Sequence, residues 1–230
     1  MSVGIQEFNS ADLQSTALQL GSDGKEGKTY TTTTQKKFKG TVFNVPISIP
    51  RRTKVAVKTF KTKKSTNRIL KEATYQQKCA VVGASPPVLG VSITEKYIVM
   101  GQLDSLPAET YSEQEMPDSL QYMICGLMGR MDKADILHCD MNALNVMLDK
   151  DGRPWMIDFG LAKPVSKSVV KKHGSMPNVS VSLWGLVRGF KRYKTGCTIM
   201  EACVAADDPS EFIDRGETLL QQFKSKKRKR

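Results

Sequence analysis

The sequence predicts an α+β protein in two parts, with strands in the N-terminal part and helices in the C-terminal part. The segment Lys54–Lys58 has the alternation of a strand, with Val55 and Val57 on one face. The segment Ser119–Met131 has apolar residues at steps of three and four, as an amphipathic helix does. The 230 residues, 40% of them hydrophobic, suffice for one ordinary domain or two small lobes.

The first 40 residues are predicted to form a leader and then a turn between two strands. Residues 1–19 are expected to be a short, loosely held leader with one strand. Residues 20–40 combine three glycines with a run of β-branched residues, which favours a strand–turn–strand arrangement. The glycines are Gly21, Gly24 and Gly27.

The rest of the N-terminal part is predicted to alternate between extended chain and one helix. Residues 41–50 should be extended, but Pro46 and Pro50 place them at a sheet edge or in a connection. A helix is expected from about Ser65 to Cys79. The segments Val88–Ser92 and Lys96–Met100 are then expected to be strands.

The C-terminal part is predicted to be mainly helical. Leu103–Asp118 is polar and should be irregular, whereas Ser119–Met131 is the clearest helix of the chain. A hairpin is expected around Asp151 and Gly152, and further helices near Val181–Arg192 and Glu211–Phe223. The resulting division is a leader at 1–19, an N-terminal lobe at 20–100, a shortened C-terminal lobe at 101–223 and a basic tail at 224–230.

One segment of the C-terminal part carries polar residues in a distinctive order. Residues His138–Asn145 have the form His-x-Asp-x-x-x-x-Asn, and Ile157–Gly160 reads Ile-Asp-Phe-Gly after an apolar strand. This segment resembles the catalytic and metal-binding segments of the protein-kinase superfamily. The resemblance covers roughly residues 20–190. It implies a bilobal kinase-like fold that binds ATP and Mg²⁺ and transfers a phosphoryl group.

The resemblance implies a role for each polar residue of this segment. Asp140 would accept or orient the proton of the attacking hydroxyl, and Asn145 and Asp158 would hold Mg²⁺ through hard oxygen ligands. His138 would be structural and tie the loop to the strand that bears Asp158. Gly160 would allow the backbone to turn after the phenylalanine.

Two charged residues of the N-terminal part fit the same chemistry. Lys58, at the end of a Val-Ala-Val-Lys strand, resembles the lysine that meets the ATP phosphates in this superfamily. Glu72 would pair with Lys58 and orient it. It is the only acidic residue between Lys58 and Glu95, which favours this role over that of an ordinary surface charge.

The remaining ATP contacts also come from the resemblance. Gly21, Gly24 and Gly27 would form the loop that covers the phosphates, although they are spaced Gly-x-x-Gly-x-x-Gly instead of the usual Gly-x-Gly-x-x-Gly. Met100 would face the adenine, with packing in the core as the alternative. The backbone of Gly101–Leu103 would contact the adenine edge.

The chain departs from the superfamily at several positions. Asn142 stands where serine/threonine kinases have a lysine, no Ala-Pro-Glu motif follows Gly160, and Ser180 stands where an aspartate is expected. An insertion is expected around Phe43–Arg52. These features resemble compact atypical kinases, namely the kinase/ATPase of the KEOPS complex and the RIO kinases. They would also suit a kinase from a large DNA virus, and cellular and viral origins both stay open.

Two classes of function therefore compete. The first is an atypical serine/threonine protein kinase that uses Mg-ATP and acts on protein substrates. The second is a catalytically weak kinase-derived ATPase, decoy or scaffold. Asn142 in place of the lysine favours the ATPase, and the short chain after Trp184 and the missing Ala-Pro-Glu motif favour the decoy or scaffold. A small-molecule kinase shares the His-x-Asp pattern, but the run Phe159–Lys163 and the small C-terminal region argue against it.

Charge and cysteine content indicate the partners and the compartment. The net charge is +12, and basic clusters such as Lys224–Arg230 favour polyanionic partners. We expect this tail to be a nuclear import signal or to contact nucleic acid, with a merely solvated tail as the alternative. The five cysteines form no Cys-x-x-Cys pair and should be reduced thiols. With no secretory signal or bilayer-length apolar run, the expected location is intracellular, in the nucleus and/or cytoplasm (of a host cell if viral), without a membrane partner.

Overall fold

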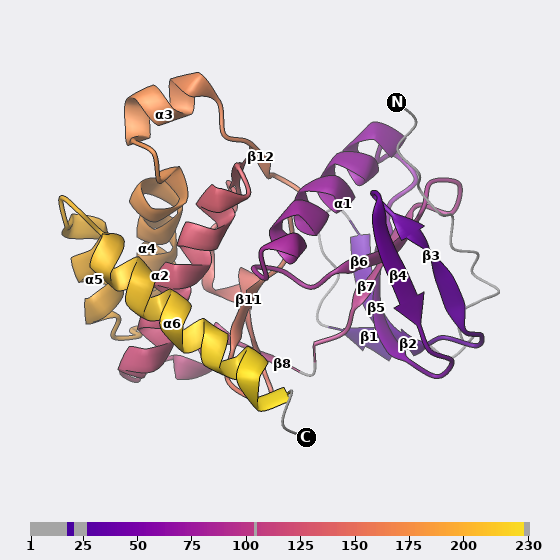
Figure 1. Cartoon of the computed structure of the whole chain (residues 1–230), viewed down its shortest axis with the longest axis horizontal. Helices are drawn as coiled ribbons and strands as arrows, with labels where there is room; N and C mark the ends of the chain where they lie inside the picture. Colours follow the sequence, from indigo (N-terminus) through magenta and orange to yellow (C-terminus); the bar gives the residue numbers. More distant parts are fainter. Residues whose placement is uncertain (1–17, 21–26, 104, 228–230) are drawn as a thin grey trace. The chain divides into compact units, whose positions relative to one another are not determined.

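The computed structural model describes residues 18–20, 27–103 and 105–227, and these fall into two compact units. The first unit ends at Gln102, and the second runs from Leu103 and also includes Val81–Ser85. The first is rich in strands and the second in helices, as predicted (Figure 1). Gly21, Gly24, most of the expected leader and the last three residues of the basic tail lie outside the described residues.

The first unit contains an antiparallel five-stranded sheet in the order β1-β2-β5-β7-β6 (Figure 1). Strands lie on both sides of Gly21 and Gly24 as expected, because β1 and β2 pair with Leu18 opposite Thr31, and the turn itself lies outside the described residues. The strands expected near residues 54, 88 and 96 are also present. Their bounds are β1 Leu18–Leu20, β2 Gly27–Thr33, β5 Lys54–Phe60, β6 Val88–Ser92 and β7 Tyr97–Gly101.

The alternation of β5 decides which of its side chains meet helix α1 (Thr66–Val81). Val55 and Val57 belong to one apolar cluster, whereas Ala56 and Phe60 belong to another that includes Ile69 of α1. Since successive side chains of a strand point to opposite faces, Lys58 shares the α1 face with Ala56 and Phe60. On α1 the buried positions include Ile69 and Glu72, so Glu72 faces the sheet.

The segment between β2 and β5 is a hairpin, where the sequence predicts only extended chain at an edge or in a connection. Strands β3 (Phe38–Val42) and β4 (Val45–Ile49) form a separate two-stranded sheet. Phe43 and Asn44 link them with φ angles of 48° and 63°, the left-handed conformation of a type I′ turn. Pro46 is tolerated because both strands of such a sheet are edge strands.

Helix α2 (Asp118–Lys133) is the centre of the second unit, and α6 (Ser210–Lys227) runs beside it (Figure 1). The predicted apolar face of α2 is buried throughout. Two more helices pack nearby, α4 (Trp184–Arg192), which continues a π-helical turn η4 (Asn178–Leu183), and α5 (Thr198–Ala205). Among the described residues, none of the helices is long and apolar enough to cross a membrane.

Short elements complete the second unit. Strand β10 (Val146–Asp149) lies between β11 (Pro154–Met156) and β8 (Ser105–Pro107), and β9 (Ile136–Leu137) pairs with β12 (Lys163–Pro164). The expected hairpin at Asp151 and Gly152 is therefore confirmed. The region 103–118 is not wholly irregular, since it contains β8 and the 3₁₀ turn η2 (Ala108–Tyr111). Helix α3 (Lys167–His173) is an element that the sequence did not predict.

We expect Gly216→Ala to destabilise the second unit, because α2 and α6 approach each other through glycines. A Cβ atom at Gly216 would lie 2.0 Å from the carbonyl oxygen of Tyr122. The helices must separate to relieve this clash, at a cost of roughly 1–3 kcal/mol. Urea unfolding measures the loss. The matched control is Gly189→Ala in α4, where the nearest atom lies at 3.5 Å, and an equal loss in both variants would contradict the prediction.

Candidate active site

The loop after β9 is held by His138, a fully buried residue. Its Nε2–H group donates to the carbonyl oxygen of Ile157 over 2.9 Å, and its ring meets the ring of Phe159 edge-on at 4.9 Å. Burial lowers the pKa of His138, so the imidazole is neutral at physiological pH. The predicted structural role of His138 is confirmed, since it connects the loop to the segment that carries Asp158.

The same loop brings three of the predicted residues, Asp140, Asn145 and Asp158, into one hydrogen-bonded framework. The amide nitrogen of the Asn145 side chain donates to the backbone carbonyl of Asp140 over 2.8 Å. The backbone carbonyl of Asn145 accepts from Ile157, next to Asp158, over 3.0 Å. Because its nitrogen is used in this way, Asn145 has its side-chain oxygen directed elsewhere, as a metal ligand would require.

The backbone at Asp158 is in the left-handed conformation, with a φ angle of 60°. Its carboxylate accepts from the backbone N–H of Gly160 over 3.2 Å. The expected turn after Phe159 is present, because Ala162 donates to the carbonyl of Phe159. Gly160 does not supply the unusual conformation, since its φ is not positive; Asp158 supplies it instead. A non-glycine residue held in this region is often found at a functional site.

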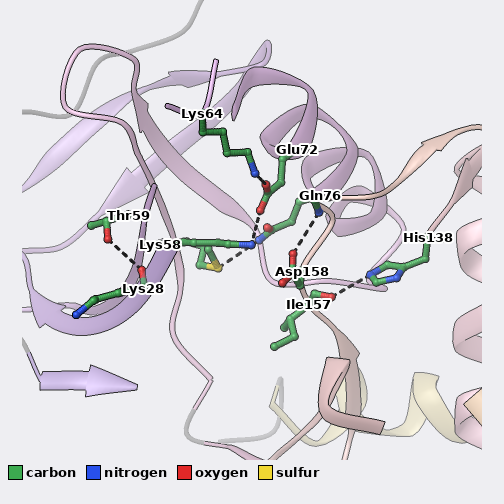
Figure 2. Close-up of polar contacts among 11 residues, drawn as sticks. Lys28, Lys58, Thr59, Lys64, Glu72, Gln76, His138, Ile157 and Asp158 are labelled. Atoms are coloured by element: carbon green, nitrogen blue, oxygen red, sulfur yellow. Dashed lines mark hydrogen bonds and ion pairs between the residues drawn. The ribbon is translucent and has the colours of Figure 1, made fainter. Parts of the chain in front are cut away.

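In the first unit, Lys58 and Glu72 form the predicted ion pair (Figure 2). The ammonium of Lys58 lies 2.7 Å from Oε1 of Glu72, and the glutamate is only 2% exposed. A second lysine, Lys64, lies 2.8 Å from Oε2 of the same carboxylate. Sequence reasoning missed Lys64, although a glutamate on the buried stripe of α1 needs compensation for its charge.

For the other predicted ATP-contact residues, the structure shows packing contacts within the protein. Met100 is 8% exposed and packs in the apolar cluster with Ile69, as the alternative prediction had it. Leu103 is half-buried at the start of the second unit. Gly27 begins β2, where a Cβ atom would lie 1.8 Å from the carbonyl oxygen of Thr59, so close strand packing explains this glycine. Contacts of these residues with a nucleotide stay predictions.

The sequence of this chain matches a known protein family. Residues 23–184 match the family of protein tyrosine and serine/threonine kinases, which is more than half of the chain. The chain belongs to this kinase family. The helical and strand-rich units described above are accordingly the two parts of a kinase domain, and a phosphotransferase is the activity that the family supports.

Three curated relatives are similar over part of the kinase domain. The chain is 34% identical to a probable cyclin-dependent kinase 9 of Caenorhabditis elegans, over 38% of this chain and 20% of the relative. It is 28% identical to a probable serine/threonine-protein kinase PknB of Lactococcus lactis, over 40% and 16%. It is 30% identical to a probable bifunctional tRNA threonylcarbamoyladenosine biosynthesis protein of Methanocaldococcus jannaschii, over 42% and 18%. The similarity thus spans at most a fifth of each relative.

The loop that follows β9 is anchored by Asn178, which sequence reasoning also missed. Its Nδ2 group donates to Oδ1 of Asp132 over 2.8 Å and to the carbonyl of Ile136 over 2.7 Å. Its Oδ1 accepts from the backbone of His138 over 3.4 Å and from Ser182 over 3.1 Å. All four hydrogen-bonding positions of this buried amide are therefore used.

The hydrogen bonds to the loop come from Asn178, two residues before Ser180, where the resemblance implies an aspartate. Ser180 is exposed, and its hydroxyl donates to the carbonyl of His173 over 2.9 Å. The side chain that faces the loop belongs to Asn178, at the first position of the π-helical turn η4. No local signal in the sequence could have found Asn178, because it lies before the predicted helix Val181–Arg192.

Asp132, the partner of Asn178, should make stability depend on pH. Burial raises the pKa of Asp132 to about 6 from 3.8, against hydrogen bonds from Asn178 and Val179 that lower it. The folded state therefore binds more protons than the unfolded state between these two values. This contribution to the free energy of unfolding is fully present below about pH 4 and is lost as the pH rises to about 6.

Replacing this carboxyl group should remove the pH-dependent contribution. We expect Asp132→Asn to flatten the fall in stability between about pH 4 and 6, a difference of roughly 3 kcal/mol at most. Urea unfolding of both proteins across this range measures it. Identical slopes in the wild type and the variant would show that Asp132 does not titrate in the folded state.

Proposed function

We propose that this chain is a compact serine/threonine protein kinase that transfers the γ-phosphoryl group of Mg-ATP to hydroxyl groups of protein substrates. The observation that carries the proposal is the link between Asn145 and Asp140. One hydrogen-bonded loop holds the residue that would receive the substrate hydroxyl together with a residue that would bind the metal. Kinase catalysis consists mainly of such positioning and of charge neutralisation.

The donor set of the loop fits Mg²⁺. This ion prefers oxygen ligands and is usually held by one or two side chains together with phosphates and waters. Asn145 and Asp158 offer an amide oxygen and a carboxylate, and Asp158 is fixed by the N–H of Gly160. When bound, the metal would neutralise charge on the phosphates.

Each remaining residue has a part in the proposed transfer. Asp140 would orient the attacking hydroxyl and accept its proton. Lys58 would contact the phosphates, and Glu72 would hold the ammonium of Lys58 in place through the ion pair at 2.7 Å. His138 would act only by holding the loop that carries Asp140.

Asn142 supports a second candidate function, that of a weak kinase-derived ATPase. Its side-chain oxygen accepts from the backbone N–H of Leu144 over 2.9 Å and caps the 3₁₀ turn η3 (Ala143–Asn145). A capping amide brings no cationic charge to the position where the family has a lysine. Transfer to a protein would then be slow compared with hydrolysis. A decoy or scaffold role would need no transfer at all.

One experiment separates these functions. The purified chain is incubated with γ-labelled ATP and with generic acidic and basic protein substrates, and labelled protein and free phosphate are counted separately. We expect label on serine and threonine that depends on Mg²⁺. Free phosphate without labelled protein would instead establish the ATPase, and the absence of both products would favour the decoy or scaffold.

Two further parts of the proposal concern the basic tail and the kinase subtype. The lysines and arginines of residues 224–230 would serve as a nuclear import signal or contact nucleic acid, within a nuclear or cytoplasmic kinase. The compact subtype, of cellular or viral origin, accords with Asn142 and the missing Ala-Pro-Glu motif. Deleting residues 224–230 should shift a fluorescent fusion out of the nucleus if the tail is an import signal.

A further inference from the structure

Glu72 receives one lysine on each oxygen of its carboxylate, as Figure 2 shows. Lys58 reaches Oε1 at 2.7 Å, and Lys64 reaches Oε2 at 2.8 Å. Glu72 is 2% exposed and Lys64 is 8% exposed, so this contact is sheltered from water. Sheltered ion pairs with direct hydrogen bonds fix geometry much better than exposed pairs do.

Neighbouring residues hold Lys64 next to Glu72. The Lys64 ammonium lies 4.3 Å from the centre of the Phe60 ring, closer than that of Lys58 at 5.6 Å. The ammonium of Lys96 donates to the backbone carbonyls of Thr62 and of Lys64, the latter over 3.0 Å. The two hydrogen bonds from Lys96 hold the loop between β5 and α1, and the Phe60 ring lies beside the Lys64 ammonium that contacts Glu72.

Lys64 restricts the orientation in which the Glu72 carboxylate can hold Lys58. A carboxylate with a single partner can rotate and take the ammonium on either or both oxygens. With Oε2 occupied by Lys64, the carboxylate offers Oε1 to Lys58 in one orientation. The three groups together also carry a net positive charge, which favours a polyphosphate nearby.

We infer that Lys64 is a positioning residue for nucleotide phosphates, acting through Glu72 on Lys58. This inference rests on the proposed function, because it takes Lys58 as the lysine that contacts ATP. Lys64 itself would not touch the nucleotide. Its effect should therefore appear on ligands that carry phosphates and not on the nucleoside alone.

The test compares binding of Mg-ATP and of adenosine to the full chain by calorimetry. Lys64→Met should weaken Mg-ATP roughly tenfold and leave adenosine unchanged, because only the phosphates feel the misplaced Lys58. Lys64→Arg keeps a cationic donor and should restore most of the affinity. The matched control is Lys63→Met, which removes the same charge from the exposed neighbour and should leave both affinities as in the wild type.

A double-mutant cycle with Glu72→Gln tests whether Lys64 acts through the carboxylate. In that background Lys64→Met should have little further effect on Mg-ATP binding, since the contact is already gone. A full additional loss, or a parallel loss of adenosine binding, would overturn the positioning role. If Lys64→Met does not fold, Lys64→Gln, which keeps a donor but no charge, takes its place in every comparison.

The outcomes also separate this inference from the proposed function. A wild type that binds Mg-ATP while Lys64→Met matches Lys63→Met would overturn the role of Lys64 alone. A wild type that binds neither Mg-ATP nor adenosine would overturn the proposed function and, with it, the inference that depends on it.

Discussion

Replacing Asp140 by asparagine should lower the rate of phosphoryl transfer by about a hundredfold or more. An asparagine keeps the shape of the side chain but cannot accept the proton of the attacking hydroxyl. The backbone carbonyl of Asp140, which holds Asn145, is unchanged by the substitution. We therefore expect kcat to fall while the KM for ATP stays close to that of the wild type.

The matched control for this prediction is Asp151→Asn. Asp151 is an exposed carboxylate in the turn between β10 and β11, so the change in charge is the same and activity should not change. Steady-state kinetics with a labelled protein substrate measures both variants. If Asp140→Asn keeps the wild-type kcat, Asp140 does not serve the transfer and the proposed mechanism fails.

Asn178→Leu should cause the largest loss of stability among the substitutions considered. The variant leaves the carbonyl of Ile136 and the N–H of His138 buried without their side-chain partner. Each buried group left without its hydrogen-bond partner costs about 1–3 kcal/mol, so we expect the free energy of unfolding to fall by roughly 3 kcal/mol or more. Because the loop loses its anchor, kcat should also fall under conditions where the protein is still folded. Urea unfolding and kinetics below the transition measure both effects.

Two comparisons make this prediction specific. Ser180→Ala, in the same helical turn but exposed, should change stability by less than about 0.5 kcal/mol. Asn178→Asp should destabilise because its carboxylate would face that of Asp132, and adding Asp132→Asn should restore part of the loss. A larger effect at Ser180 than at Asn178 would contradict the assignment of the anchor.

The features that the sequence predicts well are those encoded within a short stretch of chain. The period of β5 places Val55 and Val57 on one face, and the period of α2 defines its buried side. The ordered set from His138 to Gly160 is likewise local, and its hydrogen bonds are as expected for His138. The ion pair of Lys58 and Glu72 could be predicted because Glu72 has no acidic competitor nearby.

The features that the sequence does not predict depend on distant contacts or on unusual backbone. Asn178 meets groups about 40 residues away in the chain, and no local pattern marks an asparagine as an anchor. The β3–β4 turn uses Phe43 at positive φ, where glycine or asparagine would have signalled a hairpin. The role of Lys64 depends on how its loop folds back, and the sequence there shows only one lysine among many.

The central claim is that Asp158 helps to hold Mg-ATP in this kinase domain, and a thermal-shift measurement tests it most directly. A ligand at a hundred times its Kd stabilises the folded state by about 2.7 kcal/mol, which raises the Tm of a protein of this size by roughly 5–10 °C. We expect Mg-ATP to produce such a shift in the wild type, and Asp158→Ala to abolish its dependence on Mg²⁺. An equal Mg²⁺-dependent shift in both proteins, or none in the wild type, would contradict the account.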